Sequence, residues 1–315
     1  MTAEIRPAVP GDLPEILRLM RDELGWPDDE RAEALWRWKH EQNPFGVSPV
    51  WVAAEREGIV ALRAFLRWRM LMPDGTAVNA VRAVDTATDR RHRGQGWFRR
   101  LTLHALEAMQ AEGVDFVFNT PNEQSRPGYL SMGWTEQKRP VVWLRPGSLA
   151  RLPLLARSRT GADIWPAPCE VGLDTTEAFV GGAVPTRPDT RMGKGPAGPE
   201  TDRSPEFYRW RYGLPSLGYR VATAPGGVGA GFAVFRARRR GPSVERVLLD
   251  HVGARSAVAG ALAQPPSFDH ALAVGRFPGP GWFPVPGLGP RLVARPLASA
   301  LPNRLSLNLG DIELF

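Results

Sequence analysis

Cysteine is almost absent from this chain. Cys169 is the only cysteine among 315 residues, so no disulfide can form within the chain and no metal site can be built on several thiolates. Such a composition is typical of proteins kept in a reducing cytoplasm, and a cytoplasmic location is expected. We predict a functional site without a metal ion.

Long apolar runs are missing as well. No stretch approaches the roughly 18 consecutive apolar residues that a membrane-spanning helix needs. The first residues, Met1–Arg6, contain no apolar run of the kind found in signal peptides. From these absences we expect neither an export signal nor a membrane partner.

The length of the chain predicts two domains, because a single hydrophobic core rarely organises 315 residues. Hydrophobic residues make up 43% and charged residues 23%, as in ordinary globular proteins. We expect a boundary near residues 150–165, with one domain over residues 1–150 and another over residues 160–315.

The net charge is +7, and arginines cluster at Arg90–Arg93 and Arg236–Arg240. A basic balance fits nucleic acid, anionic lipid or an anionic small molecule. No aromatic-basic motif typical of nucleic-acid binding is recognised, so we do not expect a nucleic-acid partner. The first arginine cluster differs from the second because it lies inside a glycine motif.

Hydrophobic periodicity in the first half predicts a strand, two helices, an antiparallel meander, a helix, a strand, a short helix and a last strand. This order indicates an α/β (α+β) fold with a central, mixed but largely antiparallel sheet and flanking helices. The expected segments are Ile5–Ala8, Leu13–Leu24, Ala32–His40, Val50–Glu55, Ile59–Leu66, Val78–Thr86, Gly96–Glu112, Val114–Asn119, Ser125–Ser131 and Pro140–Leu144.

The second half echoes the first, which indicates an internal duplication. Leu35–His40 and Phe207–Tyr212 are both aromatic and basic, and a proline turn and a strand follow each. Further along, Val60–Arg67 is matched by Gly231–Arg238.

A glycine motif lies between the strand ending at Thr86 and the helix after Gly96. Backbone N–H groups at a helix N-terminus lack partners within the helix and attract anions. Gly94 and Gly96 allow a phosphate to approach the backbone, and arginines beside them add charge-assisted hydrogen bonds. A Walker loop would need Gly-Lys-Ser/Thr, and a dinucleotide fingerprint would need glycine where Arg99 stands. A pyrophosphate is the expected guest.

The pattern Arg91-x-x-Gly94-x-Gly96 resembles the Arg/Gln-x-x-Gly-x-Gly/Ala signature of the GNAT acyltransferase superfamily. Asn119…Tyr129-x-x-x-Gly133-Trp134 is similar to the family's Asn…Tyr-x-x-x-Gly-aromatic segment, and the resemblance covers about residues 5–145. It implies a GNAT fold and N-acetyltransferase activity. With the internal echo, it implies a tandem GNAT protein whose second half is degenerate, because Val247–Ser256 lacks the signature.

The resemblance also implies that acetyl-CoA is the co-substrate and that Tyr129 donates a proton to the leaving thiolate. The implied cofactor-binding residues are Val84, Asp85, Thr86, Arg91, His92, Arg93, Gly94, Gln95, Gly96, Trp97, Asn119 and Asn122.

Several assignments stay open at this point. Asp85 is the first candidate for the base that deprotonates the acceptor amine, with Glu41 and Glu123 behind it; alternatively Asp85 pairs with neighbouring arginines. Trp36 and Trp38 fit either the core or a lid over the substrate. The expected acceptor is a small-molecule or peptide amine, the chain could form a homodimer, and a longer acyl group or a non-catalytic CoA-binding module are the rival functions.

Overall fold

The computed structural model describes residues 3–147, 161–163, 165–169, 171–179, 198–253, 255–263, 268–298 and 304–313. The chain divides into two compact units. Unit 1 contains Met1–Lys138 and Arg291–Asn303, and unit 2 contains Arg139–Pro290 and Arg304–Phe315. The chain therefore passes between the units three times rather than once.

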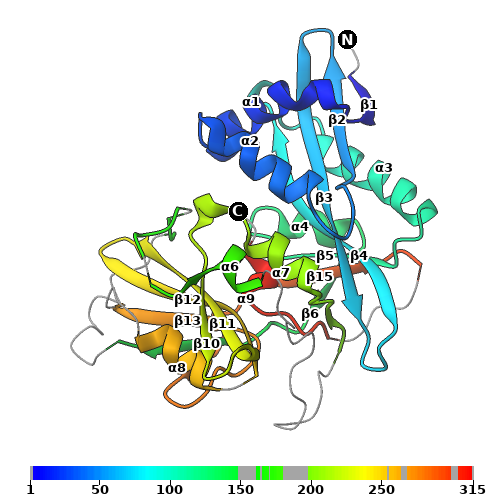
Figure 1. Ribbon diagram of the computed structural model, residues 1–315. Helices are drawn as coiled ribbons and strands as arrows, with labels where there is room; N and C mark the ends of the chain where they lie inside the picture. The colour runs from blue at the N-terminus through cyan, green and yellow to red at the C-terminus, as the bar shows by residue number, and fades with distance from the viewer. Residues whose placement is uncertain are drawn as a thin grey trace. The chain divides into compact units, whose positions relative to one another are not determined.

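Unit 1 consists of one sheet with helices on it (Figure 1). Its elements are β1 (Glu4–Pro7), η1 (Pro10–Asp12), α1 (Leu13–Leu24), α2 (Glu30–Trp36), the π-helical η2 (Arg37–Glu41), β2 (Val50–Glu55), β3 (Gly58–Leu71), β4 (Ala77–Thr88), η3 (Arg90–His92), α3 (Trp97–Ala111), β5 (Phe116–Asn119), α4 (Arg126–Ser131), β6 (Thr135–Gln137) and β15 (Leu292–Pro296).

The strands of the first sheet follow the order β1-β2-β3-β4-β5-β15-β6. The predicted meander is confirmed, since β2, β3 and β4 pair antiparallel with their sequence neighbours. β4 and β5 are parallel, and the connection between them contains α3. The largely antiparallel, mixed sheet expected from the sequence is therefore present.

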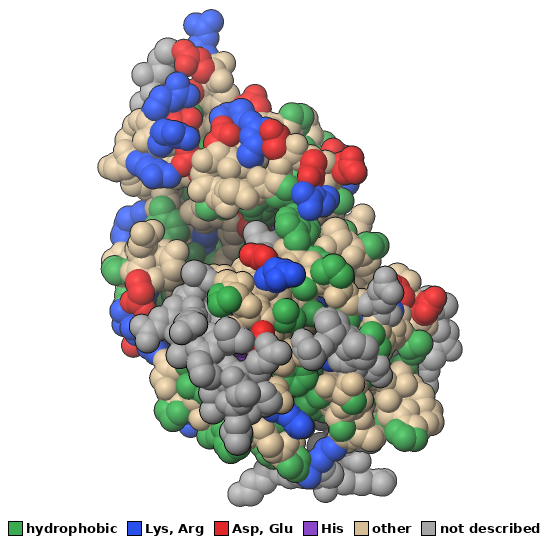
Figure 2. Space-filling view, turned by 90° about the vertical axis from the view of Figure 1, so that its left-hand side faces the viewer, with side chains coloured by type: hydrophobic (Ala, Val, Ile, Leu, Met, Phe, Trp, Pro, Cys, Tyr) green, Lys and Arg blue, Asp and Glu red, His purple; other side chains and the backbone are tan. Residues whose placement is uncertain are grey.

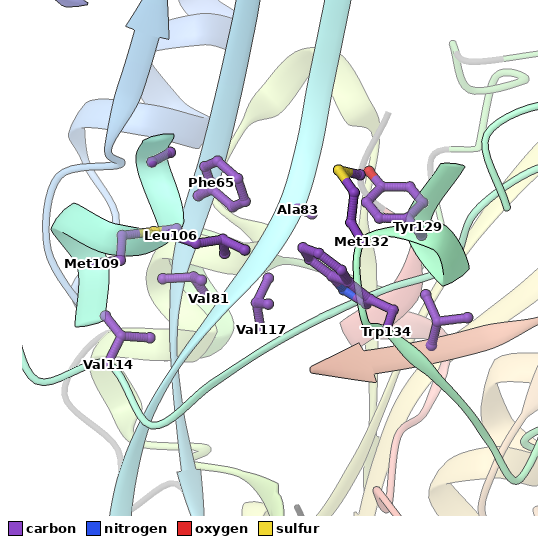
Figure 3. Packing of buried hydrophobic residues seen from close by; sticks show 12 residues of the cluster. Phe65, Val81, Ala83, Leu106, Met109, Val114, Val117, Tyr129, Met132 and Trp134 are labelled. Atoms are coloured by element: carbon purple, nitrogen blue, oxygen red, sulfur yellow. The ribbon is translucent and has the colours of Figure 1, made fainter. Parts of the chain in front are cut away.

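The core of unit 1 follows from the burial of its central strand. Residues 59–66 of β3 are buried without a break, which requires cover on both faces of the sheet. α3 covers one face with apolar side chains at helical spacing, and they pack against strand residues such as Phe65 and Val81 (Figure 3). The buried cluster contains Phe65, Val81, Ala83, Ala105, Leu106, Met109, Val114, Val117, Tyr129, Met132, Trp134 and Val293.

The strand expected to close the first half lies in the other sheet, so that prediction is wrong. The segment predicted over Pro140–Leu144 forms β7 (Val142–Pro146), which pairs with strands of unit 2. The strand that completes the first sheet between β5 and β6 is β15, from residues 292–296. Both segments are short and apolar, so the sequence pattern alone does not distinguish their partners.

Unit 2 is built around a second sheet, with the order β14-β7-β13-β12-β11-β10-β8. Its elements are β7, β8 (Leu173–Asp174), α6 (Thr175–Phe179), β9 (Glu200–Thr201), α7 (Pro205–Tyr212), η6 (Pro215–Leu217), β10 (Arg220–Ala224), β11 (Gly227–Arg240), β12 (Ser243–Gly253), α8 (Arg255–Ala263), β13 (His270–Val274), β14 (Phe283–Val285) and α9 (Leu309–Ile312).

The two sheets share the same plan. In each, antiparallel strands lead to one parallel pair, β4–β5 in unit 1 and β12–β13 in unit 2, followed by a strand from a distant part of the chain. In each sheet the antiparallel pair beside the parallel one is irregular. The register of β3–β4 shifts at Asp85, and the register of β11–β12 shifts at Leu249. The strand order of the two sheets is consistent with the expected duplication.

Charges of both signs are mixed on the surface of α1 and α2. Red and blue side chains alternate in the upper part of Figure 2, and no single basic patch covers that face. Ion pairs on these helices and on the residues next to them include Arg18–Asp22, Arg21–Asp28, Arg31–Asp29 and Arg37–Glu33. None of the helices in the described part of the chain is both long and apolar enough to cross a membrane.

Candidate active site

The candidate site begins at a bulge in β4. Arg63 of β3 pairs with Thr86, and Ala64 pairs with Val84, so Asp85 is an extra residue without a partner in the ladder. Its φ of 32° makes it the one non-glycine residue in the left-handed region across the described chain. Such strained residues cluster at functional sites because surrounding contacts must hold them.

β4 and β5 stop pairing just before the bulge. Within residues 3–147, their parallel ladder joins Ala80–Arg82 to Phe116–Phe118 and goes no further. Val84–Thr86 are partly exposed. Asn119 then ends β5, and its buried Oδ1 has no hydrogen-bond partner in the structure. The strands therefore leave backbone groups and one amide oxygen available for a ligand.

The loop after β4 leads into the N-terminus of α3. Gly94 and Gly96 have φ of 76° and 75°, a conformation that glycine adopts without strain. A Cβ at either position would meet no atom within 4 Å, so the space beside both backbones is open. Gly96 caps α3 without a side-chain hydrogen bond, and the first turn contains no acidic residue. The uncapped N–H groups can therefore receive an anion.

Two carboxylates hold this loop in place through hydrogen bonds. Asp89 accepts hydrogen bonds from the backbone and side chain of Arg91, and these bonds lower its pKa to about 2. Glu23 of α1 accepts from the backbone N–H of Arg90 at 3.0 Å and from the side chain of Arg93. Glu23 was not anticipated from the sequence, because nothing in helix periodicity indicates a partner 67 residues away.

The cofactor-binding residues predicted from the sequence fall into three groups. Val84–Thr86 and Arg91–Trp97 form one continuous strand, loop and helix start, and Asn119 lies at the end of the neighbouring strand. Trp97 faces the core and His92 packs near Glu55 and Asp89, so both offer backbone groups rather than side chains to the loop. The Oδ1 of Asn122 accepts bonds from the backbone and hydroxyl of Ser125, where it stabilises the turn before α4.

Tyr129 lies on α4 with its ring in the core. Its ring packs edge-on against that of Phe98, with centroids 5.1 Å apart. It also packs edge-on against Trp134, with centroids 5.2 Å apart (Figure 3). Its hydroxyl accepts a hydrogen bond of 2.7 Å from the guanidinium of Arg63. A guanidinium can only donate. The hydroxyl proton of Tyr129 is therefore not used in this hydrogen bond.

Arg63 is a buried residue that the sequence analysis missed. It is 1% exposed and lies over the rings of Phe65, Phe98 and Tyr129. Its guanidinium also donates to the hydroxyl of Thr86 beside the bulge. A charged residue in the middle of an apolar strand was the available indication, because buried charges need specific partners.

The carboxylate of Asp85 is held by two residues of η2. Lys39 Nζ lies 2.7 Å and His40 Nε2 lies 2.8 Å from the same oxygen, Oδ2. Burial acts to raise the pKa of Asp85, but the charge of Lys39 and the hydrogen bond from His40 outweigh it and lower the pKa to about 2. Burial lowers the pKa of His40, so its imidazole is neutral at pH 7. The alternative that Asp85 pairs with neighbouring arginines is wrong.

Sequence comparison bears on the same region. Residues 4–136 match the acetyltransferase (GNAT) domain family. Unit 1 carries a GNAT acetyltransferase domain. No curated protein is detectably similar to the chain in sequence.

Solved structures similar to this chain align with residues of both units. A conserved protein from Enterococcus faecalis has a TM-score of 0.65 at 11% identity and aligns with 95% of this chain and 73% of its own. GCN5-related N-acetyltransferases from Anabaena variabilis and Kribbella flavida have TM-scores of 0.60 and 0.59 at 13% and 14% identity. They align with 93% and 94% of this chain and 72% of their own. At this identity the likeness shows the fold.

The remaining candidates in the GNAT domain have ordinary structural partners. Glu41 pairs with Arg37, and Glu123 pairs with Arg291. Trp36 and Trp38 are 4% and 3% exposed, so both belong to the core in this structure rather than to an open lid. Trp36 packs against the ring of His40 with centroids 4.2 Å apart, which places it beside the residues that hold Asp85.

Proposed function

We propose that this protein transfers the acetyl group of acetyl-CoA to the primary amine of a small molecule or peptide. The observation that carries the proposal is the open, uncapped start of α3 next to the bulge in β4. An anion site and a stretch of strand backbone that does not pair with β5 thus lie on the same segment of the chain, as a diphosphate and its amide-containing arm require.

The residues present fit acetyl-CoA. Backbone N–H groups from Arg93 to Trp97 would hold the pyrophosphate, with the exposed guanidinium of Arg91 beside them. The backbone of Val84–Thr86 and the unpartnered Oδ1 of Asn119 would bind the amides of the pantetheine arm. An amide N–H is the natural donor to such an oxygen, since a buried acceptor without a partner costs free energy.

The proposed chemistry is direct attack of a neutral amine on the thioester carbonyl. The C–N bond forms, the C–S bond breaks, and the thiolate that leaves takes the hydroxyl proton of Tyr129. Arg63 supports this step, because its hydrogen bond to the phenol oxygen stabilises negative charge there when the proton departs.

Removal of the amine proton is assigned to water rather than to Asp85. A carboxylate with a pKa of about 2 accepts a proton poorly at neutral pH, and both of its observed contacts are hydrogen-bond donors. Asp85 is instead proposed to shape the backbone of the site.

Unit 2 is proposed to be a degenerate copy that does not bind acetyl-CoA. Its β12–β13 ladder runs through Leu248, directly up to the bulge at Leu249, so the strands separate less than in unit 1. The residue that corresponds to Asp85 is then the apolar Leu249. Asp250 beside it is bound by Arg203 and Asn308 within a buried ion network.

The function is tested by incubating the full chain with acetyl-CoA and a panel of amines that includes polyamines, amino sugars, arylamines and peptide N-termini. Release of free CoA thiol and the mass of the acetylated amine are measured together. Turnover of at least one amine supports the proposal. Saturable binding of acetyl-CoA without turnover of any amine would identify a CoA-binding module instead, and absence of binding would reject both functions. Octanoyl-CoA in parallel tests the longer acyl group.

Gly94→Glu tests the position of the diphosphate. A carboxylate in the open space beside this backbone should weaken acetyl-CoA binding by about 10- to 100-fold, through loss of charge-assisted hydrogen bonds and repulsion. Gly94→Gln imposes the same backbone strain without charge and should bind better than Gly94→Glu. Gly113→Glu, at the other end of α3, should bind like the wild type. Isothermal titration measures all three. Equal affinities for the Glu and Gln variants at position 94 would contradict the assignment.

A further inference from the structure

The conformation of Asp85 requires an explanation that the strand ladder does not provide. A left-handed conformation is unfavourable for a residue with a Cβ, and glycine would adopt it without strain. Asparagine and aspartate tolerate it best among the others, but they still need contacts that hold them. The contacts that hold Asp85 come from a different element, η2.

Lys39 and His40 are adjacent residues whose side chains converge on Asp85. Both are 1% exposed, and the side chain of Asp85 is 6% exposed. Neighbours on a regular α-helix point about 100° apart, whereas η2 is a π-helix, a rare distortion that is frequent at functional sites. The distortion therefore occurs at the residues that meet the bulge.

A second contact fixes the other part of the bulge. Arg63 donates to the hydroxyl of Thr86 and lies 3.5 Å from the carbonyl oxygen of Val84. The residues before and after Asp85 are thus restrained by β3, while Asp85 itself is restrained by η2. Unit 2, where Leu249 occupies the bulge, has no carboxylate at this position for such a contact.

We propose that Lys39 and His40 are positioning residues: by binding the Asp85 carboxylate they keep β4 bulged, and so keep the backbone of Val84–Thr86 turned toward the acyl donor. The inference rests on the proposed function, because it concerns the same acetyl-CoA site. It assigns His40 the task of donating one hydrogen bond from Nε2, with no part in proton transfer. The free energy of binding thus depends on a conformation held by side chains that do not touch the donor.

The first test separates the hydrogen bond of His40 from its basicity. In Gln, the amide N–H can replace the Nε2–H of the imidazole, but the amide does not titrate. His40→Gln should keep the acetyl-CoA dissociation constant within about threefold of wild type, whereas His40→Leu, which cannot donate, should weaken it about tenfold. Both are measured by isothermal titration at pH 7.5. Equal affinities in the two variants would overturn the proposal.

If an accepted amine is found, the pH profile of kcat gives a second readout. His40→Gln should retain the wild-type profile. A profile that loses its acidic limb in His40→Gln, with acetyl-CoA binding intact, would show that His40 takes the amine proton, and the positioning role would be wrong.

The second test isolates the backbone conformation. Asp85→Ala alone would leave Lys39 buried without its anion and could unfold the chain. We therefore pair Lys39→Met/Asp85→Gly with Lys39→Met/Asp85→Ala, which differ by a single methyl group. The glycine variant should still bind acetyl-CoA, although more weakly than the wild type because the restraining carboxylate is gone. The alanine variant should bind at least about fivefold more weakly, because only alanine is strained in the left-handed region.

Two outcomes of this second test contradict the proposal: equal affinities in the pair, or equally complete loss in both. Thermal unfolding without ligand confirms that the compared variants are folded. If the wild-type chain fails to bind acetyl-CoA, the proposed function fails first. If the wild type binds and the pairs do not differ, only the positioning role fails.

Discussion

At the scale of single residues, the candidate site depends on contacts made by buried charged side chains. Arg63 and Lys39 are each 1% exposed, and each binds a group of the site: Arg63 donates to the Tyr129 hydroxyl, and Lys39 pairs with the Asp85 carboxylate. Removing one member of such a pair leaves its partner buried without compensation. Informative variants should therefore remove a single functional group and keep the rest of the side chain in place.

Tyr129→Phe meets this requirement. It keeps the ring contacts with Phe98 and Trp134 and removes only the hydroxyl. We expect kcat to fall by about 10²- to 10⁴-fold, the usual contribution of a positioned acid, with little change in acetyl-CoA affinity. Steady-state turnover and isothermal titration measure the two quantities. Unchanged kcat would show that the thiolate takes its proton from elsewhere.

At the level of elements, β15 is the strand on which unit 1 depends. It lies between β5 and β6 and pairs antiparallel with both, although more than 150 residues of chain separate it from each. Without it, β5 would present unpaired backbone groups at a sheet edge, and the core cluster would lose Val293. A fragment limited to residues 1–150 is therefore not expected to form the complete sheet.

Val293→Asp tests the role of β15. The side chain is fully buried, and a carboxylate there would be unpaired in the core. We expect destabilisation of more than about 4 kcal/mol, the range reserved for severe core changes. Val47→Asp, the same substitution at a valine that is 63% exposed, serves as the control and should change stability by less than about 0.5 kcal/mol. Chemical denaturation measures both, and similar midpoints would contradict the assignment of β15.

For the molecule as a whole, buried ionisable groups set the response to acid. Burial, with nearby Arg276, lowers the pKa of His251 from 6.5 to about 3. Burial alone would raise the pKa of Asp85 and of Glu245, but their cationic and hydrogen-bonding neighbours lower each to about 2. In every case the unfolded chain binds a proton at higher pH than the folded chain does, so acid favours unfolding.

Each of these lowered pKa values makes the free energy of unfolding decrease as the pH falls. As pH falls below 6.5, protonation of His251 in the unfolded state lowers the free energy of unfolding, at a limiting slope of about 1.4 kcal/mol per pH unit. Below about pH 4 the carboxylates add to the loss, down to about pH 2. His251→Gln should flatten the slope between pH 6.5 and 4.5 and leave the carboxylate step in place. Urea unfolding at several pH values measures this, and an unchanged slope would exclude His251.

The glycine motif is a feature that could be predicted from the sequence alone. Gly94, Gly96 and the arginines near them determine locally that a loop turns and a helix begins uncapped, because glycine conformation and helix ends depend on neighbouring residues. The meander and α3 follow from periodicity for the same reason. The family match over residues 4–136 agrees with this interpretation.

Contacts between distant residues were decided by the tertiary structure. Lys39, His40 and Arg63 look like ordinary polar residues in sequence, and their task becomes visible once folding brings them to Asp85 and Tyr129. The exchange of β7 and β15 has the same origin: alternation of apolar residues identifies a strand, but its partner is chosen by the summed packing of a whole sheet. The sequence by itself determined the local features, such as the glycine loop and the start of the helix. The packing of the core determined which distant residues and strands pair.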